Sequence, residues 1–199
     1  MKLPPVSVDL RPYFKGEERD HRRKSLIVLH ETVSHNVKGL SDIKGVAQYM
    51  DSVGLEIHGI IDKEGHAGWC YDHDGVYDHA ASGNGHVNSR SVGFELVSEI
   101  PFAVQKGTPG ARELWNRDDR KKQLNTVARW CAYLNVEYGI PLVYSDATRP
   151  GITSHWDVSR SYLGGHGHWD CKPYHKGGHF PILYVVHKAR HIVRDYKNV

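Results

Sequence analysis

The sequence has few cysteines, no long apolar run and no large excess of charge of one sign. Its three cysteines, Cys70, Cys131 and Cys171, are widely and irregularly spaced, which argues against a disulfide framework and fits a reducing compartment. No stretch approaches the roughly 18 apolar residues that a membrane span needs, so we expect no membrane insertion. The first residues also lack the apolar core of a secretory signal, so we expect synthesis in a cytoplasm without a signal peptide.

The charge balance is equally modest. The net charge is +3 with a pI near 8.7, and acidic and basic residues are mixed along the chain. A nucleic-acid-binding protein would be expected to cluster its lysines and arginines on one face, so we predict no such partner. The length of 199 residues fits one domain, over residues 25–199, preceded by a proline-containing arm at residues 1–24.

Histidine is the residue in excess. The chain has fifteen histidines, and six of them lie between residues 155 and 187. Such enrichment points to metal binding or acid–base chemistry, although composition alone identifies no site.

The first recognisable element is a buried strand. Residues 26–29 are four consecutive aliphatic residues, a pattern typical of a strand covered on both faces, and His30 follows them directly. A histidine at a strand end either closes the strand with a hydrogen bond or belongs to a site at the rim of the sheet.

The remaining pattern alternates strands and helices, which predicts an α/β fold with a mixed central sheet flanked by helices. One helix is expected between Ser41 as its N-cap and Gly54 as its stop. A second begins near residue 120 with an apolar stripe that ends at Val136, and a last helix spans residues 180–196 with Leu183, Val186 and Ile192 inward. Further strands are expected over residues 56–62, 67–71, 91–97, 142–144 and 152–154, and an inserted loop over residues 101–119.

Glu95 interrupts an otherwise apolar strand pattern. Alternation places Val92, Phe94 and Leu96 on one face, and Glu95 on the other face together with Gly93 and Val97. The carboxylate is therefore either exposed by alternation, paired or functional.

Three separate segments offer metal ligands. A hydrolytic zinc site needs three protein ligands and one open position, and His30, His155 and one of Asp170, Cys171 or His175 would supply them. Ligands this dispersed do not suit a zinc finger, whose ligands come in short pairs. They suit a catalytic site built at the strand ends of a sheet.

Four stretches follow one another along the chain: LIVLHET, HGIIDKEG, HAASGN with NSRSVGFELV, and TSHWDVS followed by a loop rich in His, Asp and Cys. In this order they resemble the type 2 N-acetylmuramoyl-L-alanine amidases. The resemblance covers about residues 25–190 and implies that residues 25–199 form an amidase catalytic domain. It implies a mixed sheet flanked by helices, with zinc in a surface groove at the strand ends.

The resemblance implies roles for individual residues. His30 and His155 match the two histidine ligands of the family. For the third ligand Asp170 is favoured, because His-Trp-Asp resembles this loop in several phage enzymes. Cys171 and His175 remain alternatives, since a lysine separates Cys171 from the proline that usually follows the ligand directly.

Catalytic and substrate-binding residues follow in the same way. Glu95 matches the glutamate that the recycling-type amidases use as general base, whereas the tyrosine usual in phage enzymes is replaced by Ile57. His168 matches the cationic group that stabilises the oxyanion. The positions expected to contact substrate are His58, His79 and Asn88.

The function implied is zinc-dependent hydrolysis of the amide between N-acetylmuramic acid and L-alanine in bacterial peptidoglycan. Without a signal peptide or a separate wall-binding domain, the chain most resembles a phage endolysin that reaches the wall through a holin pore, and we expect a monomer. A cytoplasmic amidase that recycles muropeptides is one alternative. A peptidoglycan-binding recognition protein without catalysis is another.

Overall fold

The computed structural model describes residues 1–13, 23–32, 40–72, 75–80, 86–98, 115, 118–164, 168 and 170–198. Its centre is a six-stranded sheet in the order β1-β4-β3-β5-β2-β6. Only β3 and β4 pair antiparallel; the other neighbours are parallel. The strands are β1 (Val8–Asp9), β2 (Leu26–Glu31), β3 (Gly59–Ile61), β4 (Ala67–Trp69), β5 (Ser91–Leu96) and β6 (Gly151–Ser154). The predicted mixed sheet is therefore confirmed.

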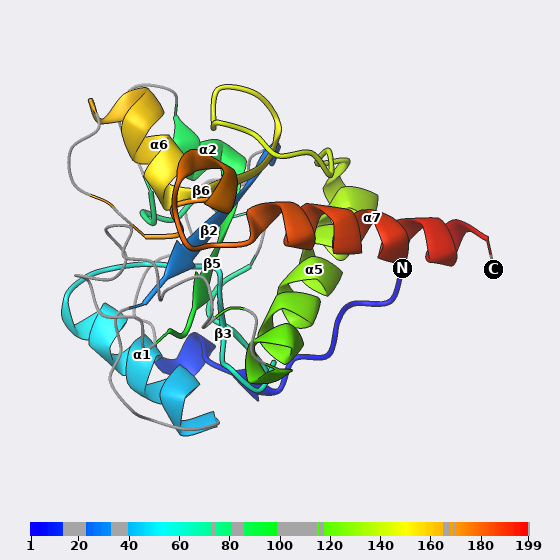
Figure 1. Cartoon of the computed structure of the whole chain (residues 1–199). Helices are drawn as coiled ribbons and strands as arrows, with labels where there is room; N and C mark the ends of the chain where they lie inside the picture. Colours follow the sequence, from blue (N-terminus) through cyan, green and yellow to red (C-terminus); the bar gives the residue numbers. More distant parts are fainter. Residues whose placement is uncertain are drawn as a thin grey trace.

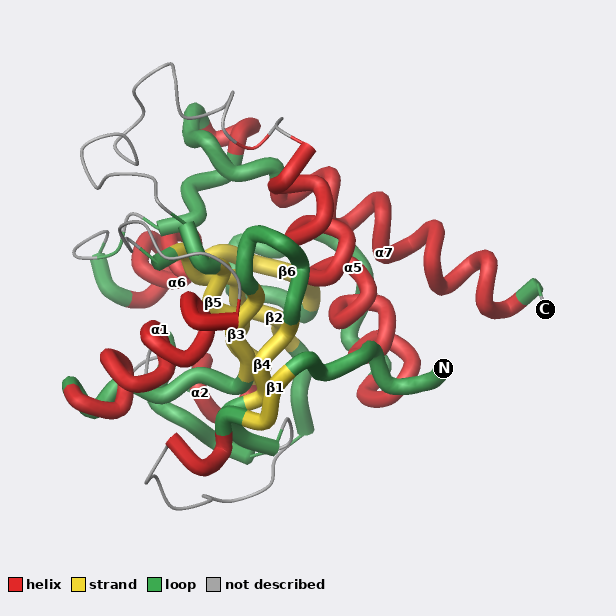
Figure 2. The backbone as a smooth tube through the Cα atoms, turned by 90° about the horizontal axis from the view of Figure 1, so that it is seen from below, coloured by secondary structure: helices red, strands yellow, loops and turns green. Residues whose placement is uncertain are grey.

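Helices cover both faces of this sheet (Figures 1 and 2). Helices α5 and α7 pack against each other on one face, and α1 lies on the other. The helices are α1 (Leu40–Ser52), α2 (Val87–Arg90), α5 (Asp118–Tyr138), α6 (His155–Tyr162) and α7 (Ile182–Lys197), with short 3-10 turns η1 (Arg11–Tyr13) and η2 (Tyr174–Lys176). Within the part of the chain described, no helix has the length and apolarity to cross a membrane.

The strand β2 shows why four aliphatic residues occur in succession. Ile27 and Leu29 belong to the core formed with α5 and α7, whereas Leu26 and Val28 pack in a cluster with Val158 of α6. Both faces of β2 are thus buried, and every residue of the strand is buried with them. By alternation, the side chain of His30 lies on the same face as Leu26 and Val28.

Several expectations are corrected. Helix α1 begins at Leu40, so Ser41 lies inside the helix and is not its N-cap. Residues 142–144 form no strand, because Tyr144 makes only an isolated bridge to Ile152. Val136 and Leu183 were expected inward but are 39% and 41% exposed.

The N-terminal arm takes part in the sheet. Residues 8 and 9 pair in parallel with β4 as its edge strand, and the side chain of Leu10 is fully buried beside α1. The predicted loop at residues 101–119 lies outside the described residues except for Trp115 and residues 118–119, which are helical.

Candidate metal centre and groove

Two neighbouring parallel strands carry the two histidines to the same edge of the sheet. His30 is the fifth residue of β2, and His155 is the first residue of α6, directly after β6. Strand β2 pairs with β6 from Leu26 through Leu29, so the ends of the two strands are adjacent. Ser154 caps α6, since its hydroxyl oxygen accepts a hydrogen bond from the backbone N–H of Asp157 at 3.2 Å. This cap fixes the position from which His155 projects.

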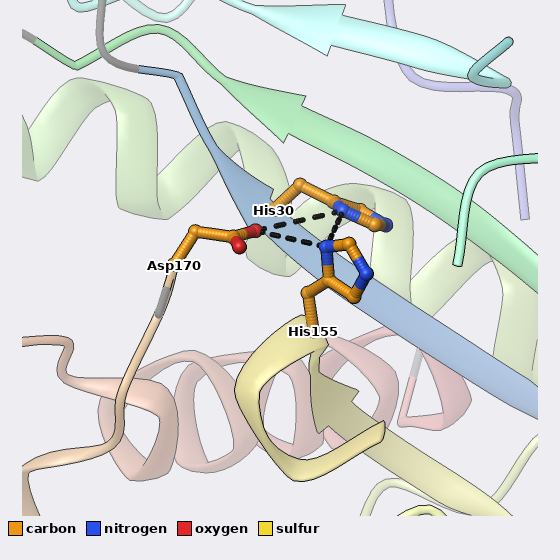
Figure 3. A group of neighbouring side chains, drawn as sticks. All are labelled: His30, His155 and Asp170. Atoms are coloured by element: carbon orange, nitrogen blue, oxygen red, sulfur yellow. Dashed lines mark hydrogen bonds and ion pairs between the residues drawn. The ribbon is translucent and has the colours of Figure 1, made fainter. Parts of the chain in front are cut away.

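Asp170 completes a triangle of ligand atoms (Figure 3). Its Oδ2 lies 3.2 Å from Nδ1 of His155 and 3.6 Å from Nδ1 of His30, and the two Nδ1 atoms are 3.0 Å apart. The histidines are only 4% and 5% exposed, and the side chain of Asp170 is 15% exposed. Three side chains from three segments thus direct one ligand atom each at a common point.

The protonation states suit a cation. Burial, together with the neighbouring His155, lowers the pKa of His30 to about 4. Burial alone would raise the pKa of Asp170, but the charge and hydrogen bond of His155, aided by His168 and His30, hold it well below its usual value. At neutral pH His30 is therefore a neutral imidazole and Asp170 a carboxylate, the forms in which both residues bind metals.

The spacing of the three atoms fits a tetrahedral ion. Ligands placed about 2.0–2.2 Å from Zn²⁺ at tetrahedral corners are separated from one another by roughly 3.3–3.6 Å. The observed separations of 3.0, 3.2 and 3.6 Å lie around that range. Two imidazole nitrogens and one carboxylate oxygen are also a ligand set that zinc accepts. His30, His155 and Asp170 could therefore hold a metal and leave one position open.

A groove of about 520 Å³ opens above this triangle. Most of the residues predicted to act in the site border it. The lining consists of His30, Glu31, Met50, Leu55, Glu56, Ile57, Asp78, His79, Ala80, Asn88, Glu95, His155, Leu163, His168 and Asp170. An open groove of this kind fits an extended substrate better than a small buried ligand.

Glu95 lies beside His30 in the sheet. The two residues are register partners of β5 and β2, and by alternation their side chains share a face. Glu95 is the only residue of β5 that is not fully buried. Burial and the nearby carboxylates of Asp170 and Glu31 raise the pKa of Glu95 well above its ordinary value. A carboxyl group in this setting binds a proton more readily than one in water, which suits a proton acceptor.

His168 flanks the triangle on its exposed side. Its ring stacks on that of His155 with centroids 3.7 Å apart, and its Nδ1 lies 3.7 Å from Oδ1 of Asp170. Half of the side chain is exposed, so His168 can meet a substrate in the groove.

The three predicted substrate residues differ in position. His79 and Asn88 line the groove but are 8% and 5% exposed. The side chain of Asn88 accepts from the backbone of Ala80 at 2.8 Å and donates to Asp78 at 3.0 Å, so it fastens the loop ahead of α2. His58 is fully buried and absent from the lining. The expectation of direct substrate contact by His58 is therefore corrected, since its ring lies beneath the groove against His79.

The two alternative third ligands lie elsewhere. The side chain of Cys171 is fully buried in the hydrophobic core, and burial raises the pKa of its thiol well above the ordinary value. His175 is exposed on η2, where its ring meets that of Tyr144 edge to face at 4.4 Å. Neither joins the triangle formed by His30, His155 and Asp170.

One buried hydrogen-bonded pair was not predicted from the sequence. Glu31, the last residue of β2, receives a 2.6 Å hydrogen bond through its Oε2 from Nε2 of His179. Both side chains are essentially unexposed. The pair joins β2 to the segment that runs from Asp170 into α7. The only sequence signal was a carboxylate directly after His30 at the end of a strand, and a carboxylate in such a position is usually solvated.

Comparison with known proteins agrees with this geometry. The family profile described as N-acetylmuramoyl-L-alanine amidase matches residues 20–174. The chain belongs to this amidase family. No match is found among curated protein sequences.

Solved structures share the amidase fold at low sequence identity. The Staphylococcus aureus hydrolase AmiA is 20% identical, with a TM-score of 0.67 over 99% of this chain and 88% of that chain. The N-acetylmuramoyl-L-alanine amidase LysC from Clostridium intestinale is 18% identical, with a TM-score of 0.60 over 94% and 99%. A mutant endolysin from Bacillus subtilis is 18% identical, with a TM-score of 0.51 over 80% and 94%. At these identities the likeness supports the fold, while residue roles rest on this chain's own geometry.

Proposed function

We propose that this amidase hydrolyses the bond between N-acetylmuramic acid and L-alanine in bacterial peptidoglycan, with zinc held by His30, His155 and Asp170. The observation that carries the proposal is the convergence of those three side chains at 3.0–3.6 Å at the floor of an open groove. Bound zinc would supply Lewis acidity that polarises the scissile carbonyl and lowers the pKa of a water molecule.

The chain's own groups would manage the protons and the developing charge. Glu95 takes the proton from the attacking water, because its partly buried carboxylate has a raised affinity for protons. It then delivers that proton to the amine of L-alanine as the amide bond breaks. His168 stands at the exposed edge of the triangle and donates a hydrogen bond to the oxygen of the attacked carbonyl.

The same site would serve a phage endolysin that acts as a monomer and reaches the wall through a holin pore. The open groove favours this role over recycling of soluble muropeptides, because a glycan strand with its stem peptides needs an unobstructed path. A wall-binding protein without catalysis would not need Glu95 and His168 beside a complete ligand triangle.

The test is incubation of the purified chain with intact peptidoglycan and, in parallel, with soluble muropeptides. We expect new L-alanine amino termini from intact peptidoglycan, loss of that product in His30→Ala, and loss and zinc-dependent recovery after chelation. His175→Ala is the matched control, since it removes a histidine outside the triangle. Binding without any new amino terminus would contradict catalysis. Cleavage of soluble muropeptides alone would contradict the endolysin role.

A further inference from the structure

We infer that a buried hydrogen-bond relay, from His30 through His79 and Ser91 to the backbone carbonyl of Val87, fixes which nitrogen of His30 faces the metal centre. His79 and Ser91 are thus positioning residues, and the inference rests on the proposed zinc site. Ser91 is fully buried and His79 is 8% exposed, so water does not compete for these hydrogen bonds.

The direction of the relay follows from its fixed end. The hydroxyl of Ser91 lies 2.6 Å from the carbonyl oxygen of Val87, which can only accept, so the hydroxyl proton is donated there. The oxygen of Ser91 also lies 2.9 Å from Nε2 of His79. With its single proton already committed, Ser91 must accept, and Nε2 of His79 must carry a hydrogen.

The same reasoning decides which nitrogen of His30 carries a hydrogen. His79 is buried, and among the described residues its ring nitrogens meet the hydroxyl of Ser91 and the imidazole of His30 but no carboxylate that could balance a charge. The ring is therefore neutral, and since Nε2 carries the hydrogen, Nδ1 carries none. This Nδ1 lies 3.1 Å from Nε2 of His30. Nε2 of His30 must therefore be the donor, and Nδ1 of His30, on the opposite side of the ring, keeps its lone pair. That is the atom directed at His155 and Asp170.

His58 and Gly93 keep His79 in place. Nδ1 of His58 accepts from the backbone N–H of Gly93 at 3.1 Å, and its Nε2 lies 3.2 Å from the carbonyl oxygen of Gly75. Both ring nitrogens of His58 are thus assigned, and its ring meets His79 edge to face at 5.3 Å. A Cβ at position 93 would lie only 2.5 Å from Nδ1 of His79, so glycine leaves the space that the relay needs.

The relay changes the role expected for His79. Both of its ring nitrogens are engaged, one by His30 and one by Ser91, so neither is free for a substrate. Hydrogen bonds behind a metal-binding histidine hold its tautomer and ring orientation, and their loss typically weakens metal binding about 10–100-fold.

The first experiment reads the tautomer directly. Long-range ¹H–¹⁵N NMR on the full chain without metal should show His30 and His79 protonated at Nε2 and unprotonated at Nδ1. A proton on Nδ1 of His30 would overturn the inference. Because this measurement needs neither zinc nor hydrolysis, it decides the relay even if the proposed amidase activity fails.

The second experiment measures zinc affinity by competition with a chelator. Ser91→Ala should weaken zinc binding about 10–100-fold, because His79 loses the acceptor that fixes its tautomer. Ser145→Ala is the matched control: it also removes a buried hydroxyl, but Ser145 bonds to Arg149 and Ala147 outside the relay. Wild-type affinity in Ser91→Ala would overturn the inference. If Ser91→Ala fails to fold, the wild-type tautomer decides the question.

Discussion

The two histidines of the candidate metal centre are held in different ways. His30 lies within a central strand, and a hydrogen bond from its Nε2 ties the back of the ring to His79. His155 begins a helix, and its buried Nε2 has no hydrogen-bond partner among the described residues. The strand half of the site, which is His30 on β2, is thus oriented by the hydrogen bond to His79 before a metal binds. The other half, which consists of His155 and Asp170, depends on the cap of α6 and on the contacts of Asp170.

This difference suggests that the two halves have different roles in metal binding. The strand half supplies a ligand of fixed tautomer and position, since β2 is paired on both sides. The half made by His155 and Asp170 can adjust as a metal or substrate enters, because no hydrogen bond among the described residues holds Nε2 of His155. The segment after Asp170 is in turn joined to the strand half through the buried Glu31–His179 pair.

The largest expected effect comes from removing the strand ligand. His30→Ala should abolish zinc binding and reduce wall hydrolysis to background, because two protein ligands rarely retain the ion. Metal content by mass spectrometry and release of L-alanine amino termini would check this. Stoichiometric zinc in the variant would mean that the strand half of the site is not required for metal binding.

The link between the halves is the next test. Glu31→Ala would leave His179 buried without its partner, and we expect a loss of about 3–5 kcal/mol in the free energy of unfolding. Urea denaturation of the metal-free chain would measure the loss. Glu137→Ala, at an exposed position of α5, should change stability by less than about 0.5 kcal/mol. Equal effects of the two substitutions would show that the pair does not hold the segment.

Two glycine substitutions, Gly93→Ala and its control Gly45→Ala, test whether the position of His79 matters for the strand half. The Cβ added by Gly93→Ala would lie 2.5 Å from His79 and 2.6 Å from Ile57, so we expect a loss of about 1–3 kcal/mol and weaker zinc binding. Gly45→Ala meets nothing within 4 Å on helix α1 and should stabilise the chain by about 0.5–1 kcal/mol. Thermal unfolding and chelator competition would compare them, and unchanged zinc affinity in Gly93→Ala would argue against a constraint on His79.

A smaller effect, with a defined pH dependence, is expected at Glu95. Its folded-state pKa is raised above 4.5, mainly by burial, so the native chain binds a proton more tightly than the unfolded chain. Wild-type stability should therefore fall as the pH rises from 4.5 toward the folded-state pKa. Glu95→Gln should stabilise the metal-free chain near pH 7 and give no such gain near pH 4. A gain that does not depend on pH would contradict a strained carboxylate.

The strand half of the site was also the part easiest to predict. Four aliphatic residues before His30 specify a central strand whatever the rest of the chain does, and the short extended run before His155 carries similar information. The relay was not predictable, because it requires the path of residues 75–80 to bring His79 behind His30. No periodicity encodes that path.

The inward face of α7 was predicted incorrectly at Leu183, and for a different reason. In α7 the buried positions include Ile182, Val185, Val186 and Val193, whereas an overlapping apolar series begins at Leu183. Both series have helical spacing, so the sequence alone could not choose between them. The choice follows from how α7 packs on α5 and the sheet. Asp170 was likewise chosen over Cys171 by resemblance, not by spacing.

The smallest effects should come from the two alternative ligands. Cys171→Ala removes a thiol from the core and should cost about 1 kcal/mol without loss of zinc. His175→Ala removes an exposed ring and should change neither stability nor metal content, whereas Asp170→Ala should lose the metal. Parallel metal measurements on the three variants test whether the adjustable half contains one ligand residue beside His155. Zinc loss in Cys171→Ala or His175→Ala would mean that this half rearranges to recruit a side chain that now lies outside the triangle.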